Sequence, residues 1–300
     1  LTEEVLAEHQ KTVGPHCAHE ISMYCDDTNP KNPRQLGKIP DMAALRKHFD
    51  GYDCGIAYMD THIGQLLDAL EKKGVMDELV IIVTADHGEN QGELGIYAEH
   101  GTADHITCNI PMIIRWPGSG AQGGTEEKGL HYNLDLGPTM MDMLDGEMGK
   151  TWDGQSYAQT LKTGEDTGRD SLVISQCAHV CQRSVRFGSW LYMRTYHDGF
   201  HLFDREMLFN LEEDPHEQNN LAKSRPELCH QGAHILMDWH DDMMATQIDY
   251  YPTDPMRIVI AEGGPALANG QLAEYCETLE KTDRGWAIEE LKKRHPREFI

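Results

Sequence analysis

One apolar run constrains this chain more than any other feature of its sequence. Residues 79–86 read LVIIVTAD, a short run of apolar and β-branched side chains. Such a run predicts a strand buried on both faces, and hence a parallel or mixed sheet flanked by helices. The run ends in Asp86, which is followed by His87 and Gly88. Because ligands of α/β sheets bind just beyond the carboxyl ends of strands, these residues mark a candidate functional site.

The neighbouring segments fit an α/β sheet. Apolar side chains recur at three- and four-residue spacing between residues 41 and 73, and Gly74 follows as a stop signal. This pattern predicts a long amphipathic helix. Residues 110–116, IPMIIRW, predict a second buried strand, and residues 133–146 predict a further helix. Helix, strand, loop and strand in this order indicate an α/β architecture.

The second half of the chain has a different pattern. Short strands of antiparallel character are predicted between residues 171 and 210, and helices with surface loops follow from residue 226. The predicted fold class is therefore α/β, with a mixed sheet flanked by helices and a smaller C-terminal antiparallel sheet plus helices. The predicted domain boundary separates residues 1–165 from residues 166–300.

The charge of the chain limits its partners. Acidic residues outnumber basic ones 50 to 26, which gives a formal net charge of −24. This balance disfavours nucleic acid and anionic membranes as partners, and no apolar run is long enough to cross a bilayer. An anionic substrate would need a local positive centre such as a metal ion. The eight cysteines are scattered, which leans slightly toward a cytoplasmic location, but the compartment stays open because the chain starts without an initiator methionine.

A carboxylate beside an imidazole at a strand end offers two metal ligands on one rigid element. Asp86 and His87 are the candidates, and Gly88 lets the backbone turn away. The alternative is a capping aspartate beside a surface histidine. His100 and His105 lie in the loop that returns to the second strand, which favours an assembled site.

Five segments in order resemble the landmarks of the sulfatase family, within the alkaline phosphatase superfamily. They are GYDCGIAYMDTHIGQLLDALEKKG, VIIVTADHGE, IPMIIRWPG, LDLGPTMMDM and MLFNLEEDPHEQNNLA, and they cover roughly residues 40–225. The resemblance implies an alkaline phosphatase-like fold. It also implies a hydrolase of sulfate esters, with a sulfated saccharide as the expected substrate class.

The resemblance further implies roles for individual residues. The family's strand-end ligands of a divalent cation, usually Ca²⁺ with Mg²⁺ or Mn²⁺ as alternatives, match Asp86 and His87. The family's sulfate-contacting lysine lies eleven residues before the proline that opens the next strand, and that position is His100 here. A protonated histidine can bind sulfate or protonate the leaving oxygen. His105 is the second candidate for this acid.

The family's nucleophile has no counterpart in this sequence. It is a formylglycine made from the first residue of C-x-P-x-R or S-x-P-x-R, and SRPEL from Ser224 lacks the closing arginine. The chain therefore resembles the C-terminal portion of a sulfatase, with the formylglycine expected in an N-terminal part. Two alternatives stay open. One is a phosphodiesterase or phosphonate monoester hydrolase of the same superfamily, and the other is a non-catalytic binding module with the sulfatase fold.

Basic side chains in the predicted antiparallel sheet are candidates for contacts with a sulfated saccharide, because aromatic faces with basic groups suit such a ligand. The alternative is that they are ordinary surface residues of the sheet. His16 and His19 could reach the site from an N-terminal loop. Cys177 and Cys181 in CAHVC are interpreted as a buried pair of structural thiols rather than as half of a zinc site. The saccharide-binding candidates are Arg186, Arg194, His197 and His201.

Overall fold

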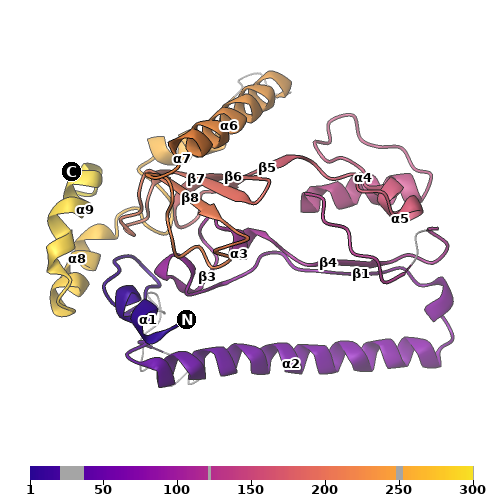
Figure 1. The fold of residues 1–300 in the computed structure, drawn as a ribbon, viewed down its shortest axis with the longest axis horizontal. Coiled ribbons are helices and arrows are strands. Elements are labelled where there is room, and N and C mark those ends of the chain that lie inside the picture. Colours follow the sequence, from indigo (N-terminus) through magenta and orange to yellow (C-terminus); the bar gives the residue numbers. More distant parts are fainter. Residues whose placement is uncertain (21–36, 121–122, 248–252, 300) are drawn as a thin grey trace.

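A computed structural model describes residues 1–20, 37–120, 123–247 and 253–299 (Figure 1). Within these residues the strands pair in three antiparallel sheets, of order β1-β4, β2-β3 and β5-β6-β7-β8. The strands are β1 (Ile81–Thr84), β2 (Asn90–Gln91), β3 (Tyr97–Glu99), β4 (Met112–Arg115), β5 (Ser171–Gln176), β6 (Cys181–Phe187), β7 (Trp190–His197) and β8 (Glu206–Asn210). The α-helices are α1 (Glu3–His9), α2 (Met42–Lys72), α3 (His105–Cys108), α4 (Leu136–Met143), α5 (Ala158–Thr163), α6 (Pro226–Thr246), α7 (Pro255–Ala261), α8 (Leu272–Lys281) and α9 (Ile288–Arg294).

The two apolar runs of the first half form a strand pair. β1 pairs with β4 from Ile81↔Arg115 to Thr84↔Met112, so the predicted strands are confirmed. The prediction that the first run is buried on both faces is wrong for the described chain. The exposed fraction is 37% for Val83 and 64% for Ile113. The reason is that, within the described residues, β1 and β4 form a sheet of only two strands.

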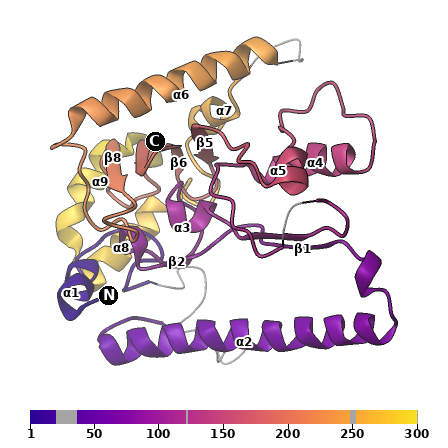
Figure 2. The same ribbon diagram turned by 45° about the vertical axis from the view of Figure 1, so that its right-hand side comes forward.

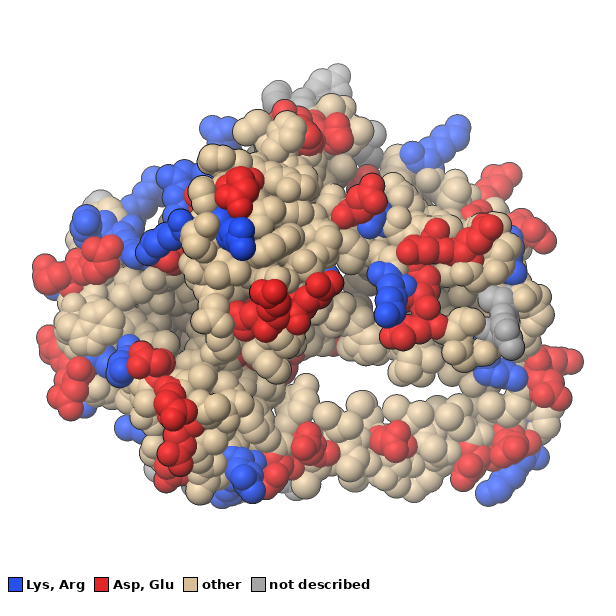
Figure 3. Space-filling model, viewed as in Figure 1, with Lys and Arg blue, Asp and Glu red and all other residues tan. Residues whose placement is uncertain are grey.

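The predicted long helix is α2, and its apolar stripe faces solvent. Asp41 caps it by accepting the backbone N–H of Ala44 at 2.8 Å, and Leu45 is its one buried residue. Ile56 and Leu66 are 48% and 59% exposed. Figures 1 and 2 show α2 running apart from the β1–β4 pair, and Figure 3 shows an open space between α2 and the rest of the molecule. No helix among the described residues is long and apolar enough to cross a membrane.

The larger sheet, β5 to β8, is the predicted antiparallel appendage. Helix α6 covers one face, where Cys229 and Leu236 pack against Val185, Tyr192 and Leu208. This confirms the predicted C-terminal antiparallel sheet with helices, although among the described residues it is the largest sheet and not a smaller one.

The opposite face of this sheet positions the candidate site. Leu191, Met193 and Phe209 pack against Ala103, which lies in the loop between β3 and α3. The backbone N–H of Ala103 also donates to Oε1 of Gln182 in β6 at 3.2 Å. The larger sheet therefore holds the loop that carries His100.

The N-terminal segment lies between β3 and the C-terminal helices. The carbonyl of His16 accepts the N–H of Tyr97 in β3 at 2.8 Å, and the N–H of Gly14 donates to the hydroxyl of Tyr275 in α8 at 2.7 Å. Val13 belongs to the core of α8 and α9. These contacts place His16 alongside β3. The division of the chain at residues 165 and 166 stays a prediction.

Candidate active site

The carboxyl end of β1 is anchored by a glycine. The N–H of Gly88 donates to the carbonyl of Thr107 in α3 at 2.9 Å. A β-carbon on Gly88 would lie 2.0 Å from the carbonyl oxygen of Ile106, so no larger residue fits there without a shift. The residues before Gly88 stay accessible to solvent. The side chain of Asp86 is 88% exposed, and its Oδ2 lies 3.7 Å from Nε2 of His87.

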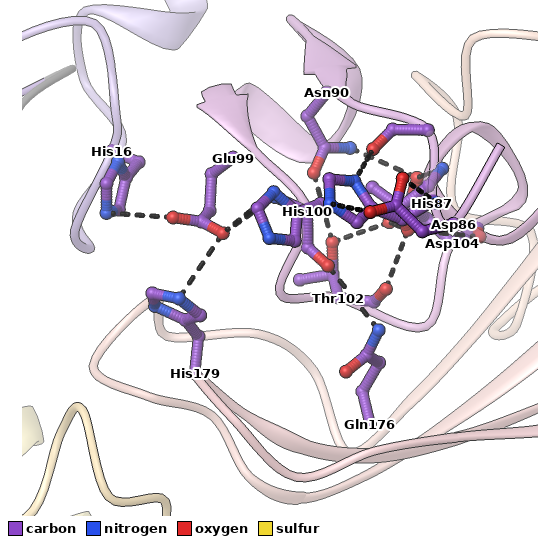
Figure 4. Close-up of polar contacts among 12 residues, drawn as sticks. His16, Asp86, His87, Asn90, Glu99, His100, Thr102, Asp104, Gln176 and His179 are labelled. Atoms are coloured by element: carbon purple, nitrogen blue, oxygen red, sulfur yellow. Dashed lines mark hydrogen bonds and ion pairs between the residues drawn. The ribbon is translucent and has the colours of Figure 1, made fainter.

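A buried aspartate fixes the return loop. Asp104 is fully buried and caps α3. It accepts hydrogen bonds from the hydroxyls of Thr102 and Thr107, at 2.5 and 2.7 Å, and from the amide of Asn90 at 3.0 Å. Burial raises the pKa of Asp104 above its usual value. The network holds the loop from β3 to α3 against the strand end (Figure 4).

His87 and His100 stack face to face. Their ring centroids are 3.7 Å apart at an interplanar angle of 14°. Nδ1 of His87 lies 2.8 Å from the carbonyl oxygen of Gly88. Because a carbonyl can only accept, Nδ1 carries the proton, and Nε2 of the neutral ring keeps a lone pair. Glu89 offers a carboxylate within 4.8 Å of both imidazoles, and burial raises its pKa.

Glu99, at the end of β3, links these residues to two further histidines. Its carboxylate oxygens lie 3.2 Å from Nε2 of His16 and 3.3 Å from Nε2 of His179. It also accepts the backbone N–H of His100 at 2.7 Å. Burial lowers the pKa of His179 to about 4, so this imidazole is neutral at neutral pH. Figure 4 shows one continuous group that runs from His16 through Glu99 and His100 to Asp86.

The structure therefore brings together three predicted site residues, Asp86, His87 and His100, and it adds His16. It does not place His105 among them. His105 begins α3, and its backbone N–H donates to Glu217 at 2.8 Å. The pKa of His105 is lowered mainly by burial and to a smaller extent by the charge of Arg186. These assignments to metal binding and catalysis stay predictions.

The four saccharide-binding candidates do not form one rim. Arg186 lies beside the turn between β6 and β7, where it donates to the carbonyl of Gly188, and Arg194 pairs with Glu206 at 3.3 Å. His197 lies at the other end of β7. His201 is hydrogen-bonded to the carbonyl oxygen of Pro15 at 2.8 Å. Their role in substrate binding stays a prediction.

Three residues of the group escaped the sequence reasoning. Glu89 directly follows Gly88, and Glu99 directly precedes His100. Their positions next to predicted site residues were the available signal. His179 lies in CAHVC, which drew attention only for its thiols. His19, proposed beside His16, instead contacts the carbonyl of Gln10 at 2.7 Å.

The CAHVC thiols are neighbours. Cys181 is buried and Cys177 is half-buried, and both are free. A hydrogen bond from the Cys181 thiol lowers the pKa of Cys177 to about 7. Among the described residues, seven cysteines are free. Cys25 lies outside the described residues.

Comparison with known proteins identifies the family. Residues 9–146 match the Sulfatase family model, and residues 92–247 match the model of the N-sulphoglucosamine sulphohydrolase C-terminal region. The chain belongs to the sulfatase family. The resemblance to the sulfatase family is thereby confirmed.

Two similar curated proteins carry sulfatase names. The choline-sulfatase of Rhizobium meliloti (strain 1021) is 28% identical over 238 residues, which cover 75% of this chain and 41% of the relative. The N-acetylglucosamine-6-sulfatase of Bos taurus is 27% identical over 212 residues, which cover 60% of this chain and 38% of the relative. The chain thus spans about two-fifths of the length of these relatives.

Solved structures show the fold. BT4656, solved in complex with its substrate D-glucosamine-2-N,6-O-disulfate, has a TM-score of 0.58 at 22% identity and covers 70% of this chain and 43% of its own. The phosphonate monoester hydrolase SpPMH from Silicibacter pomeroyi has a TM-score of 0.60 at 20% identity, with coverage of 82% and 49%. These similarities confirm the predicted α/β, alkaline phosphatase-like fold class. The predicted mixed sheet is not seen among the described residues, where all strand pairs are antiparallel.

Proposed function

We propose that this protein is a sulfatase that hydrolyses sulfate esters of saccharides with the help of a divalent cation. The observation that carries the proposal is the position of Asp86 and His87 at the carboxyl end of β1 in a chain of the sulfatase family. The substrate class is supported by the names of two similar proteins, the bovine N-acetylglucosamine-6-sulfatase and the glucosamine disulfate complex of BT4656.

The residues at the strand end fit a cation. The exposed carboxylate of Asp86 supplies the oxygen ligand that Ca²⁺ prefers. His87 fits as well, because its Nδ1–H donates a hydrogen bond to the carbonyl of Gly88, which leaves the lone pair of Nε2 for a metal ion. Metal-binding histidines commonly donate their other ring N–H in this way. A cation held there would neutralise sulfate oxygens and polarise the sulfur–oxygen bond.

His100 is assigned two tasks. Its ring is fixed by stacking on His87 and by the bond from its backbone N–H to Glu99. In its protonated form it places positive charge beside an anionic sulfate. It then gives its proton to the alcohol oxygen as the bond from that oxygen to sulfur breaks, so that the saccharide leaves as a neutral alcohol. General acid help of this kind contributes about 100- to 10,000-fold.

The nucleophile is assigned to a formylglycine in a C/S-x-P-x-R segment, which this sequence does not contain. The same site could serve phosphoryl transfer, since a phosphonate monoester hydrolase shares the fold. The substrate assay below therefore includes phosphorus esters.

The test is sulfate release by the whole protein from sulfated saccharides and an aryl sulfate, with and without a chelator. We expect chelator-sensitive release that Asp86→Ala abolishes. The matched control is Asp77→Ala, because Asp77 is an exposed residue just before β1. Cleavage of phosphodiesters or phosphonate monoesters without sulfate release would replace the proposal by the phosphorus hydrolase. Inactivity toward both classes, or unchanged turnover by Asp86→Ala, would contradict it.

A further inference from the structure

We propose that His16, Glu99 and His179 form a second metal site, for a transition-metal ion of the Zn²⁺ class, distinct from the cation position at Asp86 and His87. The three side chains come from segments far apart in the sequence: the loop after α1, the end of β3 and the loop between β5 and β6. The proposal does not depend on the proposed hydrolytic function.

The ligand spacing fits a bound ion. Nε2 of His16 and Nε2 of His179 lie 3.2 and 3.3 Å from the two carboxylate oxygens of Glu99, and one ligand atom from each residue lies within 4.8 Å of the others. In a tetrahedral site with metal–ligand bonds of about 2.0–2.1 Å, neighbouring ligand atoms are roughly 3.3–3.4 Å apart. Each imidazole nitrogen already lies at about this distance from one of the two carboxylate oxygens of Glu99.

The chemistry of the ligands selects the metal class. Two imidazoles and one carboxylate are the ligand set of zinc and related transition-metal sites that keep an open position. Ca²⁺ and Mg²⁺ prefer sites made of oxygen ligands. The position near β1 differs by the exposed carboxylate of Asp86, which adds an oxygen ligand of the kind that Ca²⁺ prefers.

Burial of the three side chains favours a bound cation. The side chains of His16, Glu99 and His179 are 9%, 11% and 12% exposed. A carboxylate removed from water in this way is costly unless positive charge offsets it. A divalent ion between the three ligands would provide that charge.

Close packing preorganises the ligands. The ring of His179 lies against the backbone of Gly101, where a β-carbon would fall 2.6 Å from both Cγ and Cδ2. Gly199 likewise leaves room for the carbonyl of His179, which would lie 2.2 Å from a β-carbon there. The imidazole is therefore packed against the backbone at Gly101, and the main chain of His179 is packed against Gly199, so the position of this ligand is restrained.

The test uses Co²⁺ as a spectroscopic probe and Zn²⁺ as its competitor, added to the whole protein after removal of metals by chelation. We expect one equivalent of Co²⁺ to bind and to give the visible absorption bands of a Co²⁺ site of low symmetry. Zn²⁺ should displace it. His179→Gln and Glu99→Gln should each weaken binding at least about 10-fold, the smallest loss typical of changes next to a metal ligand. Asp86→Asn and His234→Gln should bind as the parent does, the latter because His234 is 75% exposed on α6.

A measurement on the parent protein alone keeps the proposal testable if a ligand variant fails to fold. Millimolar Ca²⁺ should leave Co²⁺ bound, because a site with two imidazoles favours the transition metal. Loss of Co²⁺ in excess Ca²⁺, or its loss in Asp86→Asn together with retention in His179→Gln, would assign the ion to the β1 position and overturn the second site. The absence of Co²⁺ binding to the parent would also overturn it.

Discussion

Replacing Asp198 should destabilise the protein by an amount that the structure allows us to estimate. Asp198 follows β7, and its side chain is 5% exposed. Its carboxylate accepts hydrogen bonds from His295 at 2.7 Å and from Arg294 at 2.9 Å, at the end of α9. It also accepts the backbone N–H of Phe200 at 3.0 Å. The carboxylate thus ties the C-terminal helix to the larger sheet.

The pKa of Asp198 sets the size of the effect. Burial alone would raise it, but the hydrogen bond and charge of His295, together with Arg294, lower it to about 2 from the usual 3.8. This lowering of the pKa corresponds to about 2 to 3 kcal/mol in favour of the ionised form. Asn resembles the protonated side chain in shape, so Asp198→Asn should cost this amount at pH 7.

The pH dependence follows from the sign of the shift. Because the folded pKa is depressed, the stabilisation is complete above the unfolded value near 3.8 and is lost as the pH falls through about 2. Parent and Asp198→Asn should therefore differ by a constant amount from pH 7 to about pH 5 and converge in stronger acid. Urea unfolding followed by circular dichroism and tryptophan fluorescence measures this difference.

Asp238→Asn is the matched control. Asp238 lies on α6, is 65% exposed and pairs with His234 at 3.5 Å. Exposed pairs contribute little, so the control should stay within about 0.5 kcal/mol of the parent. The reasoning would be refuted by an Asp198→Asn variant as stable as this control at pH 7. It would equally be refuted by a difference that does not shrink below pH 4.

Two further predictions follow from local geometry and from a shifted pKa. Gly14→Ala should lower Tm with a cost of about 2 kcal/mol or more, because φ is +133° and a β-carbon would fall 2.3 Å from the His201 ring. Gly51→Ala, in the open middle of α2, should raise Tm slightly, and calorimetry that ranks the two the other way would contradict this. Cys177, whose pKa is about 7, should react with iodoacetamide half-maximally near pH 7 and well before Cys181, whose pKa is raised. Mass spectrometry that finds equal labelling of the two thiols would exclude the proposed thiol–thiol hydrogen bond.

The positions of the helices and strands could be predicted from the sequence better than the residues that pack against them. Hydrophobic spacing located α2 and the β1 and β4 strands, because local pattern reflects which side chains a helix or strand gathers on a face. It does not state what covers that face. Ile56 and Val83 are apolar, yet both are exposed in the described chain. The antiparallel pattern of residues 171–210 was a safer guide, since a hairpin's partners lie next to each other in sequence.

The candidate site divides in the same way. His87 and His100 lie in one short stretch and were identified together. His179 was not, because its approach to Glu99 depends on how the larger sheet packs against the loop after β3. A pairing between segments so far apart leaves no periodic signal in one sequence. His16 could be suggested as a candidate, but only the fold shows that it faces Glu99.

The position of Asp86 depends on contacts that the strand pattern does not contain. β1 is partly exposed on both faces, so its packing does little to hold the strand end in place. The restraint comes from the next residues: Gly88 donates to Thr107, whose hydroxyl and N–H bind the buried Asp104. The residue before Asp104 in turn donates to Gln182 of β6. The strand end is therefore fixed to the larger sheet through a buried aspartate, and that sheet also carries the loop of His179, so one network holds both ends of the candidate site.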